Sequence, residues 1–216
     1  MPKVLITGFM PFGGEEINPS WQLASRLNGA TIDGYDIVVA EIPVARFEAL
    51  HSIIAHIEKH QPKIIINLGQ AGGRTEMTPE RVGVNIDDYG AADNAGNQPV
   101  DEPIEVGGPA ACFSSLPIKA MVEAMRSAGV PASVSNSAGT YLCNHVAYGI
   151  PRYLEKEHID AIAGFMHVPF LPEQASKQRG RSSMAIETMV MGLTAAVKAA
   201  IAHQNGDVKA EGGATH

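Results

Sequence analysis

The chain has 216 residues, of which 45% are hydrophobic and 18% are charged, so we expect one globular domain over residues 1–204. A polar, glycine-rich segment follows at residues 205–216 and is expected to be a mobile tail. The formal net charge of −7 and the scattered basic residues argue against a nucleic-acid partner, and no apolar run is long enough to cross a membrane.

Apolar runs rich in β-branched residues alternate along the chain with segments of helical periodicity. The predicted strands are residues 4–7, 37–42, 64–68, 131–135 and 161–168. The predicted helices are residues 19–27, 46–60, 117–128, 143–156 and 183–203. This alternation predicts an α/β domain with a mostly parallel sheet covered by helices on both faces. In such sheets ligands bind beyond the carboxyl ends of the strands, so the chemistry is expected in the strand-to-helix loops.

Two features interrupt this alternation. Residues 80–109 are rich in Asp, Asn, Gly and Pro, which predicts a hairpin or a long ordered excursion that forms a lid or a binding wall. Pro151 falls inside the predicted helix 143–156, where it removes one hydrogen bond and clashes with the Ala147 carbonyl. We therefore expect that helix to end or to kink at Pro151.

The two cysteines of the chain, Cys112 and Cys143, form neither a disulfide framework nor a zinc pattern, which favours a cytoplasmic location. Cys143 follows a small-residue run that turns at Gly139-Thr140, and it lies in the first turn of a predicted helix. Helix starts favour anions, so this position is expected to lower the pKa of the thiol and make it a nucleophile. A buried structural cysteine is the competing interpretation, and the role of Cys112 stays open.

A cysteine nucleophile needs a base, and His167 is the preferred candidate because it closes a predicted strand at the edge where catalytic loops converge. His145 is closer in sequence, but two positions along a helix diverge by about 200°. The imidazole needs a third group to orient it. Glu80 and Glu76 both follow the strand at residues 64–68, and their spacing does not separate them.

Glycine-rich loops follow two of the predicted strands, at residues 8–14 and 69–73. Neither is a phosphate-binding P-loop or a dinucleotide fingerprint. Phe9 and Phe12 are unusual in such a turn, and they suit either a small apolar pocket or a cap over the core.

In combination these residues resemble the pyroglutamyl peptidase I (pyrrolidone-carboxylate peptidase) family of cysteine peptidases. The resemblance runs from Lys3 to about Ser183. Its motifs, in chain order, are Thr7-Gly-Phe-Met-Pro-Phe-Gly-Gly14, Asn18-Pro-Ser-Trp21, Gly69-Gln-Ala-Gly-Gly-Arg74, Glu80-Arg-Val82, Asp93-Asn94, Asn97-Gln-Pro99, Gly108-Pro-Ala-Ala111, Leu116-Pro-Ile-Lys119, Ala138-Gly-Thr140, Cys143-Asn-His145, His167-Val-Pro169 and Pro172-Glu-Gln174.

The resemblance implies a three-layer α/β/α sandwich with a mostly parallel mixed sheet, related to the nucleoside-phosphorylase architecture. It also implies a homotetramer without a metal or an organic cofactor. By motif, it places the catalytic roles on Cys143 as nucleophile, His167 as base and acid, and Glu80 as orienter of the histidine. The residues that it places around the substrate ring are Phe9, Phe12, Asn18, Gln70, Tyr141 and Leu142.

The implied activity is removal of an N-terminal pyroglutamyl (5-oxoprolyl) residue from peptides through a thioester acyl-enzyme. The chain departs from the family pattern in one loop, where Tyr89-Gly-Ala-Ala92 replaces the usual Ala-Arg-Ile-Pro run. Gly90 and Ala91 thus stand where the family has Arg and Ile, which removes a charge and apolar bulk from the wall beside the site.

Two other functions are compatible with the same fold. Loss of the arginine at Gly90 raises the hypothesis of a catalytically weak protein that only binds 5-oxoproline. A phosphorolytic transferase is a third hypothesis, but it requires basic residues converging on phosphate, and the sequence indicates none.

Overall fold

Strands and helices alternate along the chain in the computed structural model, which describes residues 1–213. The strands are β1 (Lys3–Phe9), β2 (Thr31–Ile32), β3 (Tyr35–Ile42), β4 (Ile64–Gln70), β5 (Thr78–Pro79), β6 (Val82–Val84), β7 (Ala111–Phe113) and β8 (Ile162–Val168). The helices are α1 (Pro19–Ser25), α2 (Arg46–His60), α3 (Ile118–Ser127), α4 (Leu142–Lys156), α5 (Pro172–Ala175) and α6 (Ile186–Ala202).

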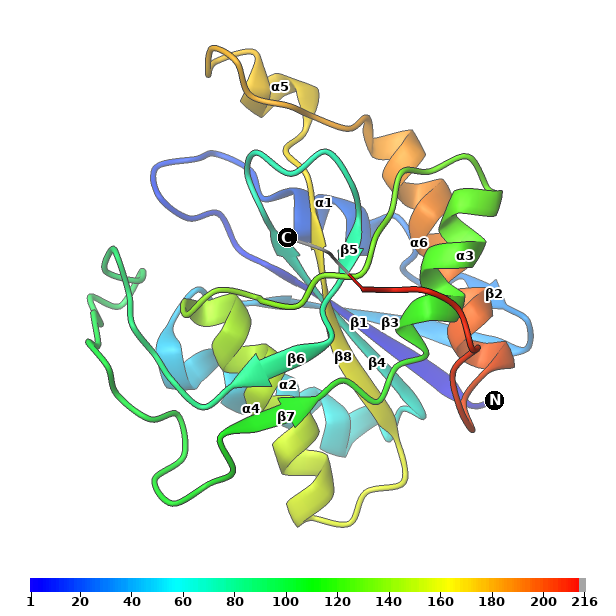
Figure 1. The fold of residues 1–216 in the computed structure, drawn as a ribbon, viewed down its shortest axis with the longest axis horizontal. Coiled ribbons are helices and arrows are strands. Elements are labelled where there is room, and N and C mark those ends of the chain that lie inside the picture. The colour runs from blue at the N-terminus through cyan, green and yellow to red at the C-terminus, as the bar shows by residue number, and fades with distance from the viewer. Residues whose placement is uncertain (214–216) are drawn as a thin grey trace.

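The main sheet has six strands in the order β2-β3-β1-β4-β8-β5 (Figure 1). β3, β1, β4 and β8 are mutually parallel, whereas the short edge strands β2 and β5 run antiparallel to their neighbours. The central strands are apolar along nearly their whole length and are buried on both faces, as parallel strands between two helical layers must be.

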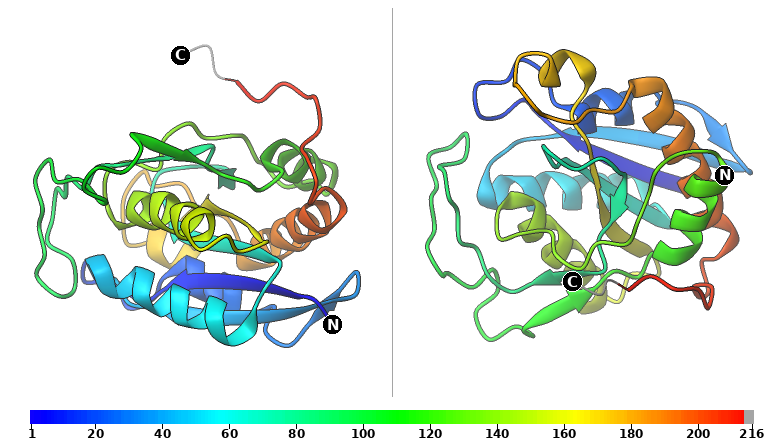
Figure 2. Two further views of the ribbon diagram at one scale, coloured as in Figure 1. Left: turned by 90° about the horizontal axis from the view of Figure 1, so that it is seen from below. Right: turned by 45° about the horizontal axis from the view of Figure 1, so that its top comes forward.

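Helices cover both faces of this sheet, which confirms the predicted three-layer α/β/α sandwich. Alternate side chains of β4 point to opposite faces of the sheet. Ile64 and Ile66 pack with α1, α3 and α6, whereas Ile65 packs with α2 and α4. Figure 1 shows α3 beside α6 on one side and α2 with α4 on the other, and Figure 2 shows the same layers from two more directions.

The predicted excursion is a hairpin. β6 and β7 pair antiparallel and pack on α4, and residues 85–110 extend between them as a long loop away from the core (Figure 1). The close approach of β6 to α4 requires Gly83, because a Cβ there would lie 2.6 Å from Ala147 C and 2.7 Å from Tyr148 Cα.

Two sequence predictions were wrong. Residues 131–135 are not a strand, although they run beside residues 77–81 and make the isolated bridges Met77↔Ala132 and Glu80↔Ser135. Backbone hydrogen bonds join the two segments, for example from Ser133 N–H to the Met77 carbonyl, but Pro79 has no N–H to donate and so interrupts the ladder. The expectation that the helix ends at Pro151 was also wrong, because α4 continues through Pro151 to Lys156. Burial of its apolar face, for example of Val146 and Ile150, holds the helix against the local cost of proline.

The described part of the predicted tail contacts the domain. The Asp207 carboxylate accepts hydrogen bonds from the amides of Lys119 (2.9 Å) and Ala120 (2.9 Å), and so caps α3. Residues 214–216 of the predicted tail lie outside the described residues, and its mobility stays a prediction. No helix within residues 1–213 has the length and apolar character that crossing a bilayer requires.

We predict that Gly83→Ala destabilises the protein by about 1–3 kcal/mol, because the added methyl group would push β6 away from α4. Gly90→Ala is the matched control, since a Cβ at position 90 meets nothing within 4 Å, and its effect should stay within about 0.5 kcal/mol. Urea unfolding of both variants measures the difference. Equal stability of the two variants would contradict the proposed close packing.

Candidate active site

Cys143 is the second residue of α4, and its thiol lies against the end of β4. Gly139 adopts a positive φ of 77° and Tyr141 is extended, so the chain turns sharply into the helix at this point. A Cβ on Gly69 would lie only 2.9 Å from the Cys143 sulfur. The thiol therefore occupies space that is open only because residue 69 is a glycine.

His167 reaches the same place from β8. It is the register partner of Gly69 on β4 and of Thr78 on β5, and it is only 4% exposed. The structure thus brings Cys143 and His167 to the same residue of the sheet from two different elements. Within residues 1–213 the sulfur and the ring make no hydrogen bond, so proton transfer requires the tightening that substrate binding commonly produces.

Glu80, rather than Glu76, is the carboxylate that contacts the histidine. Glu80 Oε1 lies 2.7 Å from His167 Nδ1, and Glu80 is 1% exposed. Glu76 instead accepts a hydrogen bond from the Ser133 hydroxyl. An ionised carboxylate can only accept, so it selects the tautomer with the proton on Nδ1 and leaves Nε2 as the free base.

The same Glu80 oxygen also accepts a hydrogen bond from Arg74 at 2.8 Å. The Arg74 guanidinium further donates to the Thr78 hydroxyl and to the Ser137 carbonyl. Burial alone would raise the pKa of Glu80, but the bonds and charges of His167 and Arg74 hold it below its usual value. Glu80 is therefore ionised when it faces the imidazole.

Burial raises the pKa of the Cys143 thiol to about 12, and the Glu80 charge adds to this rise. Arg74 and the Cys143 backbone N–H act in the opposite direction but do not compensate. The expectation of a lowered thiol pKa was therefore wrong, because desolvation exceeds the effect of the helix start. Burial also lowers the pKa of His167, although Glu80 partly opposes this. At neutral pH the pair is a thiol beside a neutral imidazole.

A small cavity of about 170 Å³ opens beside the Cys143 sulfur. All six residues that the resemblance assigned to the substrate ring line this cavity. Its lining consists of Phe9, Phe12, Asn18, Val44, Gln70, Tyr141, Leu142 and Cys143. The sequence interpretation missed Val44, although its position just beyond β3 of a parallel sheet is the kind of place that faces a ligand.

The polar groups of the cavity are held by neighbours. The Asn18 side chain caps α1 through Ser20 and donates to the Met10 carbonyl, so it also shapes the loop after β1. Gln70 Oε1 accepts from Gln174 at 2.9 Å. These contacts fix the orientation of both amides before any ligand enters.

An aromatic wall closes one side of the cavity. The Phe12 and Tyr141 ring centroids are 5.3 Å apart, and Tyr89 lies 4.4 Å from Tyr141 on the other side. The departure at Gly90 and Ala91 is directly beyond Tyr89, and both residues are exposed. The wall at this point therefore consists of Tyr89, without the bulk that the resemblance implies for the next two positions.

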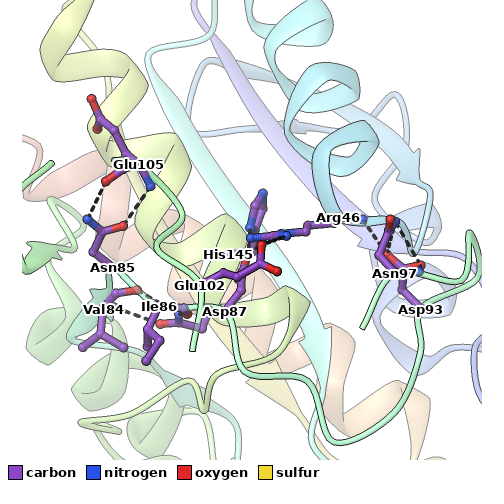
Figure 3. Close-up of polar contacts among 11 residues, drawn as sticks. Arg46, Val84, Asn85, Ile86, Asp87, Asp93, Asn97, Glu102, Glu105 and His145 are labelled. Carbon is purple, nitrogen blue, oxygen red and sulfur yellow. Dashed lines mark hydrogen bonds and ion pairs between the residues drawn. The ribbon is translucent and has the colours of Figure 1, made fainter. Parts of the chain in front are cut away.

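A buried charge network holds the excursion that carries Tyr89 (Figure 3). Asp87 pairs with Glu102 through two backbone hydrogen bonds, and Arg46 bridges their carboxylates at 2.7 Å and 2.6 Å. The Asp93 carboxylate accepts a hydrogen bond from the Arg46 backbone amide. The excursion is therefore attached to the start of α2 through both the side chain and the backbone of Arg46. The sequence interpretation did not identify this network, because its residues are far apart in the chain.

His145 belongs to this network and not to the thiol. Its Nδ1 lies 2.8 Å from Asp87 Oδ2, and the ring is completely buried (Figure 3). Asn144 next to it bonds to both the amide and the carbonyl of Val84. These contacts tie the first turns of α4, and with them Cys143, to the excursion.

No group of three or more His, Cys, Asp or Glu side chains among residues 1–213 is arranged to hold a metal ion. Cys112 lies on β7 and lines a separate cavity together with Pro151 and His158. The chemistry available near the small cavity is therefore that of Cys143, His167, Glu80 and Arg74.

Comparisons with known proteins agree with this geometry. A family profile described as pyroglutamyl peptidase matches residues 2–203. The pyrrolidone-carboxylate peptidase of Erwinia tasmaniensis is 50% identical over 216 residues, with complete coverage of both chains. The protein of the same name from Enterobacter sp. is 49% identical, also with complete coverage.

Solved structures of the same kind superpose closely. Pyroglutamyl peptidase I from Bacillus amyloliquefaciens has a TM-score of 0.94 and 44% identity, covering 98% of this chain and 100% of that one. Pyrrolidone carboxyl peptidase from Thermococcus litoralis has a TM-score of 0.93 and 36% identity, with the same coverage.

We predict that Cys143 remains a thiol at pH values where an ordinary cysteine, with a pKa of about 8.5, is half ionised. The measurement is an alkaline titration of thiolate ultraviolet absorbance in the Cys112→Ser variant, which leaves Cys143 as the sole thiol. Full thiolate absorbance already reached by about pH 8 would contradict the burial argument.

Proposed function

Since this chain belongs to the pyroglutamyl peptidase family, we propose that Cys143 is its nucleophile, His167 its general base and acid, and Glu80 the orienter of His167. The chain is a hydrolase that removes an N-terminal pyroglutamyl residue from peptides. The observation that supports these residue roles best is the meeting of Cys143 and His167 at Gly69, beside a cavity of about 170 Å³.

In the proposed first step, His167 Nε2 accepts the Cys143 proton as the sulfur attacks the carbonyl that follows the substrate ring. Because the resting thiol is neutral, proton transfer accompanies attack rather than preceding it. Glu80 stabilises the imidazolium that forms. The Cys143 backbone N–H at the start of α4 is a natural donor to the developing oxyanion, a contribution that is typically worth about 10²–10³ in rate.

Collapse of the tetrahedral intermediate breaks the carbon–nitrogen bond, and the imidazolium gives its proton to the departing amine of the peptide. The acyl group remains on sulfur as a thioester. Water then attacks this thioester while His167 accepts a water proton, and the thiolate leaves and recovers that proton as 5-oxoproline is released. Each proton that His167 takes is returned, so the cycle is balanced without a cofactor.

The cavity suits the five-membered lactam of pyroglutamate. Phe9 and Phe12 offer apolar surfaces to the ring methylenes, and the amide of Gln70 together with Asn18 offers polar partners to the lactam edge. Tyr141 and Leu142 complete the wall next to the sulfur. A proline ring lacks the lactam carbonyl and would leave these buried polar groups unpaired, so we propose that the site rejects it.

The family match favours the peptidase over the two other hypotheses. A binding protein without turnover rests only on the exposed Gly90, which lies beyond Tyr89 and outside the cavity lining. A phosphorolytic transferase would need a cluster of basic side chains at the cavity, and the lining within the described residues contains none.

Three further parts of the proposal concern the whole chain. We propose that residues 1–204 form one catalytic domain followed by the tail at 205–216, and that the protein is cytoplasmic, as its two free cysteines suggest. We also propose a homotetramer. Exposed Phe113, Val106 and Val100 on the β6–β7 hairpin and its loop support an interface between copies.

Cys143→Ser is predicted to lower turnover of a chromogenic pyroglutamyl amide by at least about 10³-fold, because a serine hydroxyl is a far weaker nucleophile here. Cys112→Ser is the matched control and should retain activity, since Cys112 lines a different cavity. A prolyl amide serves as the substrate control. Equal residual activity of the two variants would exclude Cys143 as the nucleophile.

The pH dependence of kcat/KM follows from the His167 pKa, which burial lowers below its usual value of about 6.5. Activity requires the neutral imidazole and is lost as the pH falls through that lowered pKa, so the acid limb should lie below about pH 6.5. A profile measured on the free enzyme tests this expectation. A limb clearly above pH 7 would show that the base is not a desolvated histidine.

A further inference from the structure

Arg74 has no role in the reaction steps proposed above, yet it contacts Glu80, the carboxylate that orients the proposed base. Arg74 Nη1 and His167 Nδ1 approach the same oxygen, Glu80 Oε1, at 2.8 Å and 2.7 Å. Glu80 is almost fully buried, whereas the Arg74 side chain is 31% exposed. The three side chains form a continuous arginine–carboxylate–imidazole unit that runs from the partly exposed Arg74 to the buried His167.

This sharing has an electrostatic consequence for the imidazole. A buried carboxylate bonded to a histidine stabilises the imidazolium and so favours early protonation of the base. A guanidinium on the same oxygen takes up part of that negative charge and also repels a proton on the ring. The Arg74 charge acts to lower the pKa of both His167 and Cys143.

A protonated His167 would inactivate this site. With the thiol neutral at physiological pH, the neutral imidazole is the only group placed to take its proton. Many cysteine nucleophiles avoid this requirement by resting as a thiolate beside an imidazolium, but burial of Cys143 disfavours that state. The site therefore depends on keeping its histidine uncharged.

We propose that Arg74 is a positioning residue that holds Glu80 in place and offsets its charge, so that His167 stays neutral and able to accept the Cys143 proton. This inference rests on the proposed role of His167. Arg74 also donates to the Ser137 carbonyl, in the segment that leads to Cys143, so one side chain fixes both sides of the site.

The groups that face His167 are few, which makes the effect of Arg74 separable. The charged or titratable ones are Glu80, Arg74 and the Cys143 thiol, whereas β4 contributes Gly69 and β5 contributes Thr78, both uncharged. Removing the Arg74 charge therefore leaves Glu80 as the only full charge facing the ring.

The test compares kcat/KM–pH profiles of the wild type, Arg74→Gln, Arg74→Lys and Arg81→Gln on a chromogenic pyroglutamyl amide. Arg81 is the matched control because it also bonds to the segment before α4, at Asn136, but does not bond to Glu80. Arg74→Gln should move the acid limb to higher pH by about half a unit to one unit, while kcat/KM on the plateau falls by less than about tenfold. Arg74→Lys should bring the acid limb most of the way back to its wild-type pH, and Arg81→Gln should leave the pH of the acid limb unchanged.

The inference is overturned if the Arg74→Gln limb coincides with that of the wild type, if Arg74→Lys shifts as far as Arg74→Gln, or if Arg81→Gln shifts equally. NMR titration of the His167 ring with and without Arg74→Gln, in a Cys143→Ser background, reads the same shift without turnover. Loss of the acid limb in the wild type itself would instead refute His167 as the base, so the two failures are distinguishable.

Discussion

The parallel pairing of β4 with β8 is the constraint on which the rest of the site depends. It sets Gly69 beside His167, and the missing side chain at Gly69 leaves the space in which the Cys143 sulfur lies. A shift of one residue in this register would turn His167 toward the opposite helical layer and bring a larger residue under the sulfur. Cys143 and His167, the proposed nucleophile and base, are thus brought together by the register in which β4 and β8 pair.

Two buried carboxylates of the molecule are each neutralised in the same way, by one histidine and one arginine. His167 bonds to Glu80, which bonds to Arg74, and His145 bonds to Asp87, which bonds to Arg46. Both units bury a carboxylate between a histidine and an arginine, which avoids the large cost of an unpaired buried charge. The first unit contains His167, the proposed base. The second lies behind the first turn of α4 and fastens the excursion, and with it the aromatic wall at Tyr89, to α2.

Much of this arrangement could be predicted from the sequence. The apolar stripe of residues 46–60 predicted α2 with the bounds that the structure has. The predicted strands also placed Phe9, Gln70 and His167 at the carboxyl ends of strands, where the structure has them as the last or next-to-last residues of β1, β4 and β8. Spacing alone could not choose Glu80 over Glu76, because that choice depends on how β5 pairs with β8. The predicted lowering of the Cys143 pKa was wrong because desolvation of the thiol depends on residues that are distant in sequence. The predicted helix end at Pro151 was wrong for a similar reason, since tertiary packing of α4 outweighs the low helix propensity of proline. Arg46 and Asp87 carry no local motif at all.

The Glu80–His167 contact joins positions 87 residues apart, and β8 is the last strand in the chain. Much of the sheet can pair earlier along the chain, but the Glu80–His167 contact cannot form until β8 lies between β4 and β5. Long-range closures of this kind are slow relative to local helix formation. With His167 as the proposed base, hydrolytic competence is therefore a property of the finished molecule alone, because a nascent chain that still lacks β8 contains Cys143 but not His167.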